Sequence, residues 1–210
     1  MKYPKTSGDL YPHPVMFFDY YIADTVNVPI SLKIEDMAGK TLNIFVSDKW
    51  DVADTVGNMD LSSTTYLLDQ SLAKSIGFHR FKWDMRHLGP WDERDRLAHK
   101  NGPYVASGDY RVKLTVGETV SIQNFRLLTD PRVLSLGVTE EEIQKQEALG
   151  LEVVKLLTEV RKYVHGLERE KKSAQGKRLE HIQSQLASFV MEEGIYMQPK
   201  IINQIEYLYA

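Results

Sequence analysis

The chain has 210 residues, of which 42% are hydrophobic and 26% are charged, and its formal net charge is −3. This composition is typical of a soluble globular protein with one domain or two small ones. The slight acidic excess argues against a nucleic-acid-binding surface, because such surfaces carry an excess of lysine and arginine. The chain has no cysteine, which excludes disulfide bonds, thiolate metal sites and cysteine nucleophiles.

Membrane-targeting segments are not expected either. No apolar run approaches the ~18–20 residues that a transmembrane helix needs, so we expect no membrane insertion. Residues 1–14 predict an irregular lead-in, because Pro4, Pro12 and Pro14 oppose regular structure. The same residues lack the apolar stretch of a signal peptide.

The next residues alternate in the manner of β-strands. Residues 15–22 are rich in aromatic side chains and predict a strand that could be buried on both faces. Residues 30–34 alternate between apolar and polar, which predicts a strand with one face toward water. A short connection containing Gly39 leads to a return strand over residues 42–46, which completes a hairpin.

Residues 48–76 predict a long loop. Four aspartates are spread along its first part: Asp48, Asp51, Asp54 and Asp60. Aspartate oxygens are calcium ligands, but the spacing does not match the compact D-x-D-x-D-G loop. A solvated acidic loop is therefore the favoured interpretation, and calcium binding by residues 48–60 stays open.

Residues 77–129 organise the rest of the chain. Residues 78–83 and 110–116 alternate as strands, and Gly117 begins a tight turn into a further strand that includes Val120. These strands predict the closing half of a small antiparallel sandwich.

The motif at the end of the first of these strands has a structural interpretation. We expect Trp83 to fill the core, because large aromatic side chains dominate protein interiors. Asp84 and Arg86 are expected to pair with each other and hold the loop that follows.

After residue 130 the apolar period changes from two to 3.6, which predicts helices. Thr139 and Glu142 match a capping box at the start of a helix of about 30 residues. Two rows of residues repeat every seven positions along it: Ile143, Gly150, Leu157 and Val164, with Gln146, Val153, Val160 and Leu167. Such rows predict a helix–helix contact, although Gln146 and Gly150 are weak positions for one.

A second helix follows a turn at Gly176, and a short connection makes the two helices antiparallel neighbours. Its apolar stripe consists of Leu179, Ile182, Leu186 and Phe189. Gly194 is expected to end this helix and Pro199 to begin a short third one. The third helix or a partner must then cover the remaining apolar surface of the hairpin.

Three loop aromatics are candidate ligand-binding residues. Trp50, Trp91 and Tyr104 could stack on sugar rings as a carbohydrate-binding platform, although loop aromatics also pack down as lids. The carboxylates of Asp92, Glu93 and Asp95 could resemble the pair of a glycosidase. They lie in a highly charged run, so a solvated run is the favoured interpretation.

No pattern predicts a catalytic, cofactor-binding or metal residue. Four of the histidines, His79, His87, His99 and His165, are scattered without metal-ligand spacing. No Gly-x-Ser-x-Gly elbow and no phosphate-binding loop occurs. A basic group near residues 169–178 alternates with glutamates and favours a solvated helix end. The sequence therefore predicts a protein that is not an enzyme and holds no cofactor.

The order of several motifs resembles a known family. The motifs are Phe81-x-Trp83-Asp84-x-Arg86, Gly89-Pro90, Gly108-x-Tyr110-x-Val112-x-Leu114, Asp130-Pro131-Arg132, Tyr196-x-Gln198-Pro199 and Tyr207-Leu208-Tyr209. This series is similar to the immunoglobulin-like module of the flagellar hook-capping type, with its helical tail. That module follows sortilin-type or neuraminidase-repeat propellers in bacterial secreted proteins, a group often labelled glycosyl hydrolases. The resemblance covers roughly residues 15–209.

The resemblance completes the expected fold. It implies an immunoglobulin-like antiparallel β-sandwich over residues 1–130, including the lead-in of residues 1–14. A helical hairpin tail with a short third helix follows over residues 131–210. The fold class is thus mainly β with α.

The expected function is that of a non-catalytic accessory module of a secreted or cell-envelope bacterial protein. It would dock to an adjacent propeller domain, to another protein, or to a second copy through the helical hairpin. The resemblance implies a periplasmic or extracellular location. Two alternatives stay open: a carbohydrate-binding module that uses Trp50, Trp91 and Tyr104, and the C-terminal fragment of a propeller glycosidase-like protein.

Overall fold

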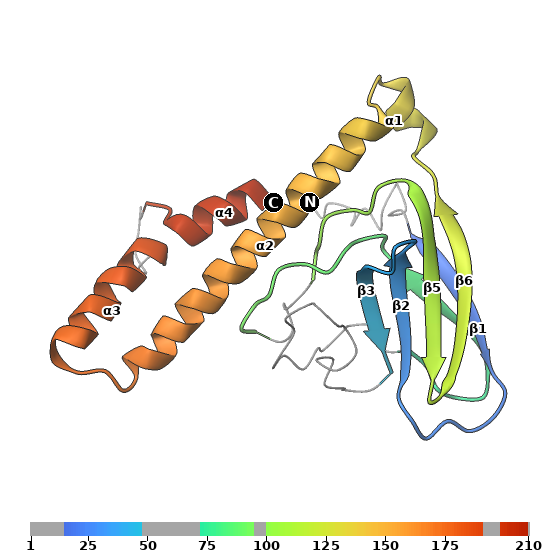
Figure 1. Cartoon of the computed structure of the whole chain (residues 1–210), viewed down its shortest axis with the longest axis horizontal. Coiled ribbons are helices and arrows are strands. Elements are labelled where there is room, and N and C mark those ends of the chain that lie inside the picture. The colour runs from blue at the N-terminus through green and yellow to red at the C-terminus, as the bar shows by residue number, and fades with distance from the viewer. Residues whose placement is uncertain (1–14, 48–71, 95–99, 191–197, 210) are drawn as a thin grey trace, which may run out of the picture.

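A computed structural model of the chain describes residues 15–47, 72–94, 100–190 and 198–209. It shows a β-sandwich and a helical arm, whose longest helix passes beside the loops at one side of the sandwich (Figure 1). Trp50, Asp95, His99 and the acidic segment 48–60 lie outside the described residues.

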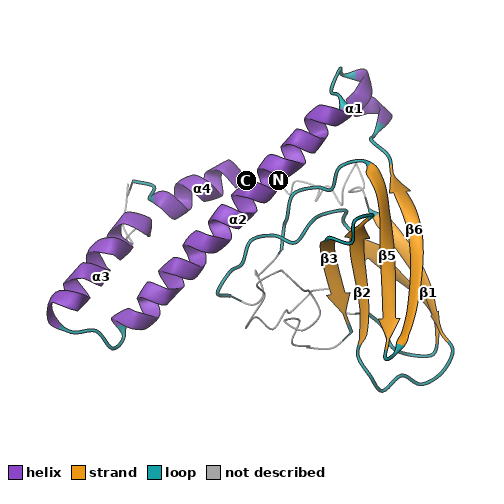
Figure 2. Ribbon diagram, viewed as in Figure 1, coloured by secondary structure: helices purple, strands orange, loops and turns teal. Residues whose placement is uncertain are grey.

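Six strands form two antiparallel sheets (Figure 2). They are β1 (Met16–Ile22), β2 (Ile30–Asp36), β3 (Thr41–Val46), β4 (Gly77–Trp83), β5 (Gly108–Val116) and β6 (Thr119–Leu127). One sheet pairs β1 with β4, and the other has the order β3-β2-β5-β6. This arrangement corresponds to strands B-E and C′-C-F-G of an immunoglobulin-like sandwich. The predicted fold class is confirmed.

The core lies between the two sheets. Trp83 at the end of β4 has no exposed surface, as expected of a core residue, and Phe18 of β1 stacks on it with ring centroids 6.2 Å apart. Phe125 of β6 meets both rings edge-on, at 5.4 Å from Phe18 and 6.2 Å from Trp83. These aromatic contacts join the two sheets, since each sheet contributes a ring to the same cluster.

Tyr110 fixes the backbone that leads into β5. Its hydroxyl donates a hydrogen bond of 2.9 Å to the carbonyl oxygen of Ala106, four residues earlier. This is the geometry of the tyrosine corner, which immunoglobulin-like sandwiches place at the start of strand F. Burial, together with the charges of Glu147 and Asp36, raises the pKa of Tyr110 to about 12. The side chain therefore stays a neutral donor at physiological pH.

Two strands differ from the expected pattern of burial. β1 is buried on one face only, because Phe17 and Tyr21 point outward and are exposed. β2 lacks the expected wet face, since it runs between β3 and β5 and its polar side chains are covered by neighbours. Glu35 is buried there with Lys33 at 2.7 Å and Arg111 at 3.0 Å. Ion pairs within β2 and across to β5 thus replace water on this face.

Four helices follow the sandwich: α1 (Pro131–Ser135), α2 (Glu140–Lys171), α3 (Gly176–Phe189) and α4 (Ile201–Tyr209). The predicted capping box is confirmed, because Thr139 and Glu142 exchange hydrogen bonds at the start of α2. α1 is an addition to the prediction, and Asp130 caps it by accepting from the Arg132 backbone.

The helical hairpin is also present. α3 ends at Phe189, earlier than predicted, because Val190 already has extended backbone angles; Gly194 lies outside the described residues. α4 begins at Ile201, two residues after Pro199, and packs against α2 through the buried Ile205. The third helix therefore covers part of the hairpin, as expected. Among the described residues, no helix is both long and apolar enough to cross a bilayer.

We predict that Tyr110→Phe destabilises the sandwich by about 1–3 kcal/mol, because the buried Ala106 carbonyl oxygen loses its donor. Urea denaturation should show a lower midpoint with an unchanged slope. Tyr207→Phe, which alters an exposed tyrosine of α4, is the matched control and should leave the midpoint in place. Equal midpoints for wild type and Tyr110→Phe would contradict this role.

Candidate functional site

The connection between β4 and β5 contains two described segments, residues 84–94 and 100–107, which we call the loop platform. Arg86 and Tyr104 form an isolated antiparallel bridge between its two segments. The bridge is flanked by hydrogen bonds of 2.9 Å from His87 N to Pro103 O and from Val105 N to Met85 O. The two segments therefore behave as a short hairpin rather than as separate loops.

The Gly-Pro pairs of the platform allow this close approach. A Cβ atom at Gly89 would lie 1.8 Å from the carbonyl oxygen of Lys100, and one at Gly102 would lie 2.0 Å from that of His87. These contacts are with backbone atoms, so no side-chain movement can relieve them. Both glycines are therefore required by the crossing of the two segments.

Arg86 holds the platform, but not through the expected pair with Asp84. Asp84 Oδ1 instead accepts the backbone N–H of Arg86 at 3.2 Å. The Arg86 guanidinium lies 3.8 Å from the centroid of the Tyr104 ring and donates to the carbonyl oxygen of Gly102 at 2.9 Å. The guanidinium prefers the ring and the carbonyl because both lie on the facing segment of the platform.

The platform rests on the first half of α2. His87 Nε2 lies 2.6 Å from Glu147 Oε1, and the same oxygen accepts the backbone N–H of Ala106 at 3.2 Å. One turn later, a Cβ atom at Gly150 would come within 2.8 Å of Pro103. Gly150, a weak position for a helix–helix contact, is thus explained by the platform that packs there.

Electrostatics at this contact favour a charged Glu147. Burial pushes the pKa of Glu147 upward, but the hydrogen bonds from His87 and from the Ala106 backbone outweigh burial and hold the pKa below its ordinary value. His87 is only 8% exposed. A general acid or base must reach a substrate. Because His87 is buried against the half-buried Glu147, the pair is suited to joining the platform to α2.

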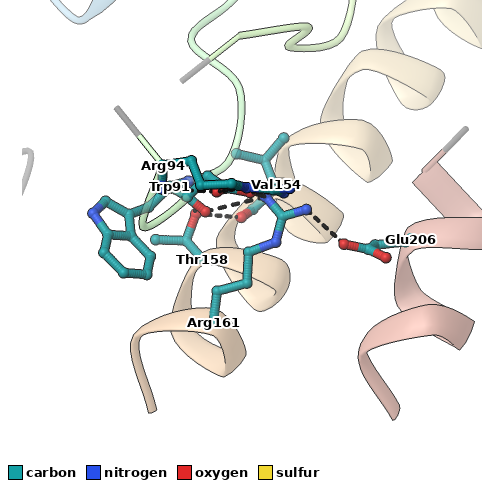
Figure 3. Close-up of polar contacts among 7 residues, drawn as sticks. Trp91, Arg94, Val154, Thr158, Arg161 and Glu206 are labelled. Atoms are coloured by element: carbon teal, nitrogen blue, oxygen red, sulfur yellow. Dashed lines mark hydrogen bonds and ion pairs between the residues drawn. The ribbon is translucent and has the colours of Figure 1, made fainter. Parts of the chain in front are cut away.

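A second contact joins the platform to the middle of α2 and to α4. Arg161 lies 3.3 Å from Asp92 and 2.7 Å from Glu206, and it donates to the carbonyl oxygen of Trp91 at 3.2 Å. Figure 3 shows the guanidinium reaching between the segment that carries Trp91 and the Glu206 side chain of α4. Arg161 therefore connects three elements that are distant in the sequence.

Asp92 corrects the expectation of a solvated charged run, because its side chain is buried. The Arg94 guanidinium donates two hydrogen bonds to the Asp92 carboxylate, at 2.9 and 3.0 Å. Burial alone would raise the pKa of Asp92, but these bonds and the charge of Arg161 hold the pKa below its ordinary value. A carboxylate kept charged by two guanidinium groups is a structural anion rather than a proton donor.

The aromatic candidates have different surroundings. Trp91 packs against α2, where its backbone N–H donates to Thr158 Oγ1 at 3.1 Å and its ring meets His165 edge-on at 5.5 Å. Tyr104 is 48% exposed, with Arg86 over its ring. Carbohydrate binding by Trp50, Trp91 and Tyr104 stays a prediction, since Trp50 lies outside the described residues.

One further group in the described ranges has the residue types of a metal site. Glu93, His165 and Glu168 place their ligand atoms within 4.8 Å of one another. Sequence reasoning missed this group because Glu93 is far from the others in the chain. The i, i+3 spacing of His165 and Glu168, which puts them on one helix face, was an available signal.

Sequence reasoning also missed Glu147, Arg161 and Glu206, the residues that join the platform to the helices. Each lies in a charged helical segment, and helical periodicity marks such positions as solvent-facing. Glu147 and Arg161 gain their buried partners when the platform docks on α2, and Glu206 meets Arg161 because α4 packs on α2.

Comparisons with known proteins identify no relative. No family model, no curated protein and no solved structure matches the chain. The resemblance to the propeller-associated module therefore stays a prediction.

We predict that Arg161→Gln loosens the platform and α4 while the sandwich stays folded. The variant removes the contacts to Asp92, Glu206 and the Trp91 carbonyl, at a cost of about 1–3 kcal/mol. Hydrogen exchange should accelerate in residues 89–94 and 201–209 but not in β2 and β5. Arg178→Gln, which alters an exposed ion pair with Glu170, is the control. Unchanged exchange in α4 would refute this.

We also predict that the stabilisation from Glu147 is lost at acid pH. Because the folded-state pKa lies below the ordinary value of 4.5, the contribution is fully present above pH 4.5 and declines as pH falls through the lowered pKa. The stability difference between wild type and Glu147→Gln, measured by urea denaturation, should shrink below pH 4.5. Glu152→Gln, an exposed change on α2, serves as control. A difference that grows on acidification would contradict the assignment.

Proposed function

We propose that the chain is a non-catalytic interaction module whose helical tail docks onto another protein surface, and that a second copy of the chain can occupy this surface. The observation that carries the proposal is a row of exposed apolar side chains on α2, which we call the open row: Leu149, Leu156 and Tyr163. Leu149 is 62% exposed and Leu156 is 48% exposed.

The open row has the spacing of a helix–helix contact. Its three residues recur every seven positions, the repeat by which one helix presents a continuous seam to another. α3 covers only its C-terminal end, where Phe189 packs edge-on against Tyr163 at 5.4 Å. α3 ends at Phe189, and Leu149 and Leu156 continue the seam beyond it with about half or more of their surface exposed.

A second copy of the chain carries the same open row, so the row can meet itself across a two-fold axis. Fully burying a leucine contributes about 1.5–3 kcal/mol, and each copy supplies two. The resemblance adds a natural context, namely an adjacent propeller domain in a secreted or cell-envelope protein, outside the cytoplasm.

The proposed lack of catalysis is supported by the partners of the carboxylates at the contact between the platform and α2. Asp92 and Glu147 are engaged with cationic or backbone partners that join elements of the fold. Hydrolysis of a glycan panel by the purified chain, abolished by replacing a loop carboxylate, would contradict this part of the proposal.

We predict that the chain self-associates in sedimentation velocity experiments and that Leu149→Glu combined with Leu156→Glu gives a monomer. Charged residues in an apolar seam should weaken the dimer at least about tenfold. Leu136→Glu, which changes an exposed leucine outside the open row, is the matched control and should leave the dimer intact. A wild-type chain that is monomeric at every concentration, or an equal effect of Leu136→Glu, would refute self-association through the open row.

A further inference from the structure

We propose that Glu93, His165 and Glu168 form a binding site for a divalent transition-metal ion of the Zn²⁺ class. The three side chains come from two elements: Glu93 from the loop platform, and His165 and Glu168 from successive turns of one face of α2. Their ligand atoms all lie within 4.8 Å of one another. The docking of the platform on α2 therefore creates the site.

The distances suit a site that closes around an ion. Zinc binds imidazole nitrogen and carboxylate oxygen at about 2.0–2.2 Å, so neighbouring ligand atoms in a tetrahedral site lie about 3.3 Å apart. His165 Nδ1 and Glu93 Oε2 are already 3.4 Å apart. Glu93 and Glu168 are exposed, so their side chains are free to rotate by the remaining distance.

The hydrogen bonding of His165 also suits a metal ligand. Its Nδ1 atom is buried and has no hydrogen-bond partner, although a buried polar atom ordinarily has one. The imidazole is held by the edge-on contact with Trp91, which fixes its direction. Its nearest charged neighbour is Glu93 Oε2 at 3.4 Å, and an ion between these two atoms would be bound by both of them.

The surroundings leave room for a further ligand. The three residues line an open cavity of about 440 Å³, together with Arg169, Lys171 and Lys172. One imidazole and two carboxylates leave a coordination position that water or an anion can fill. The three basic side chains oppose a cation, which lowers its affinity, and they favour an anion as the additional ligand.

The metal site shares no residue with the open row, so it does not depend on the proposed self-association. It adds a link between the loop platform and the end of α2 near the α2–α3 turn. Metal binding there would stabilise the same docking that Arg161 maintains further along the helix, because an ion that binds only the docked arrangement shifts the equilibrium toward it.

The test uses the full tag-free chain after treatment with a chelator, titrated with Co²⁺ and then with Zn²⁺. We expect one equivalent of Co²⁺ to produce a visible absorption band, with quenching of the fluorescence of Trp91, whose ring lies 5.5 Å from that of His165. Trp91→Phe should keep the absorption band and lose this part of the quenching. Zn²⁺ should displace Co²⁺ and raise the melting temperature of the chain.

Two pairs of variants identify the ligands. Glu168→Gln should weaken Co²⁺ binding at least about tenfold, and Glu159→Gln, an exposed change on the same helix, should not. His165→Gln should abolish the absorption band, whereas His181→Gln on α3 should retain it. Circular dichroism establishes that each variant is folded. No saturable binding at about 1 mM Co²⁺, or equal binding by wild type and Glu168→Gln, would overturn the proposal.

Discussion

The packing of the helices against the sandwich depends on the position of Arg161. One guanidinium group contacts a buried carboxylate in the loop platform, a backbone carbonyl in the same loop and a carboxylate on α4. Moving two charged groups out of water costs desolvation free energy, and an ion pair offsets it only when its geometry is good and further hydrogen bonds are made. The network meets this condition, because Arg94 also satisfies Asp92.

The loop platform connects the Arg161 network to the sandwich. Its two segments cross at Gly89 and Gly102, where only glycine fits, and Arg86 ties them together through Tyr104. The carbonyl oxygen of Arg86 accepts hydrogen bonds from Trp83 in the core and from Asn43 on β3. A continuous chain of contacts thus runs from the central tryptophan to the long helix. This chain of contacts therefore helps to orient α2 against the sandwich.

Several titratable groups consequently have structural roles in places where a sequence suggests chemistry. His87, Glu147 and Asp92 are the residue types of acid–base catalysis. His87 and Glu147 instead pair with each other between the platform and α2, and Asp92 pairs with Arg161 of α2. The cluster of Glu93, His165 and Glu168 differs, because two of its members are exposed and it opens onto a cavity. This difference in access separates groups that hold the fold from groups that are available to a ligand.

The sequence by itself determined where the strands and the long helices lie, but not the buried faces of β1 and β2. Alternation located the strands, Thr139 and Glu142 located the start of α2, and Trp83 was identified as a core residue, since these signals are local. Only the tertiary structure decided which charged side chains are buried. Asp92 and Arg161, like Glu93 and His165, are far apart in the chain and meet because the platform docks on α2. Periodicity shows which face of a helix is polar, but it does not show what will cover that face.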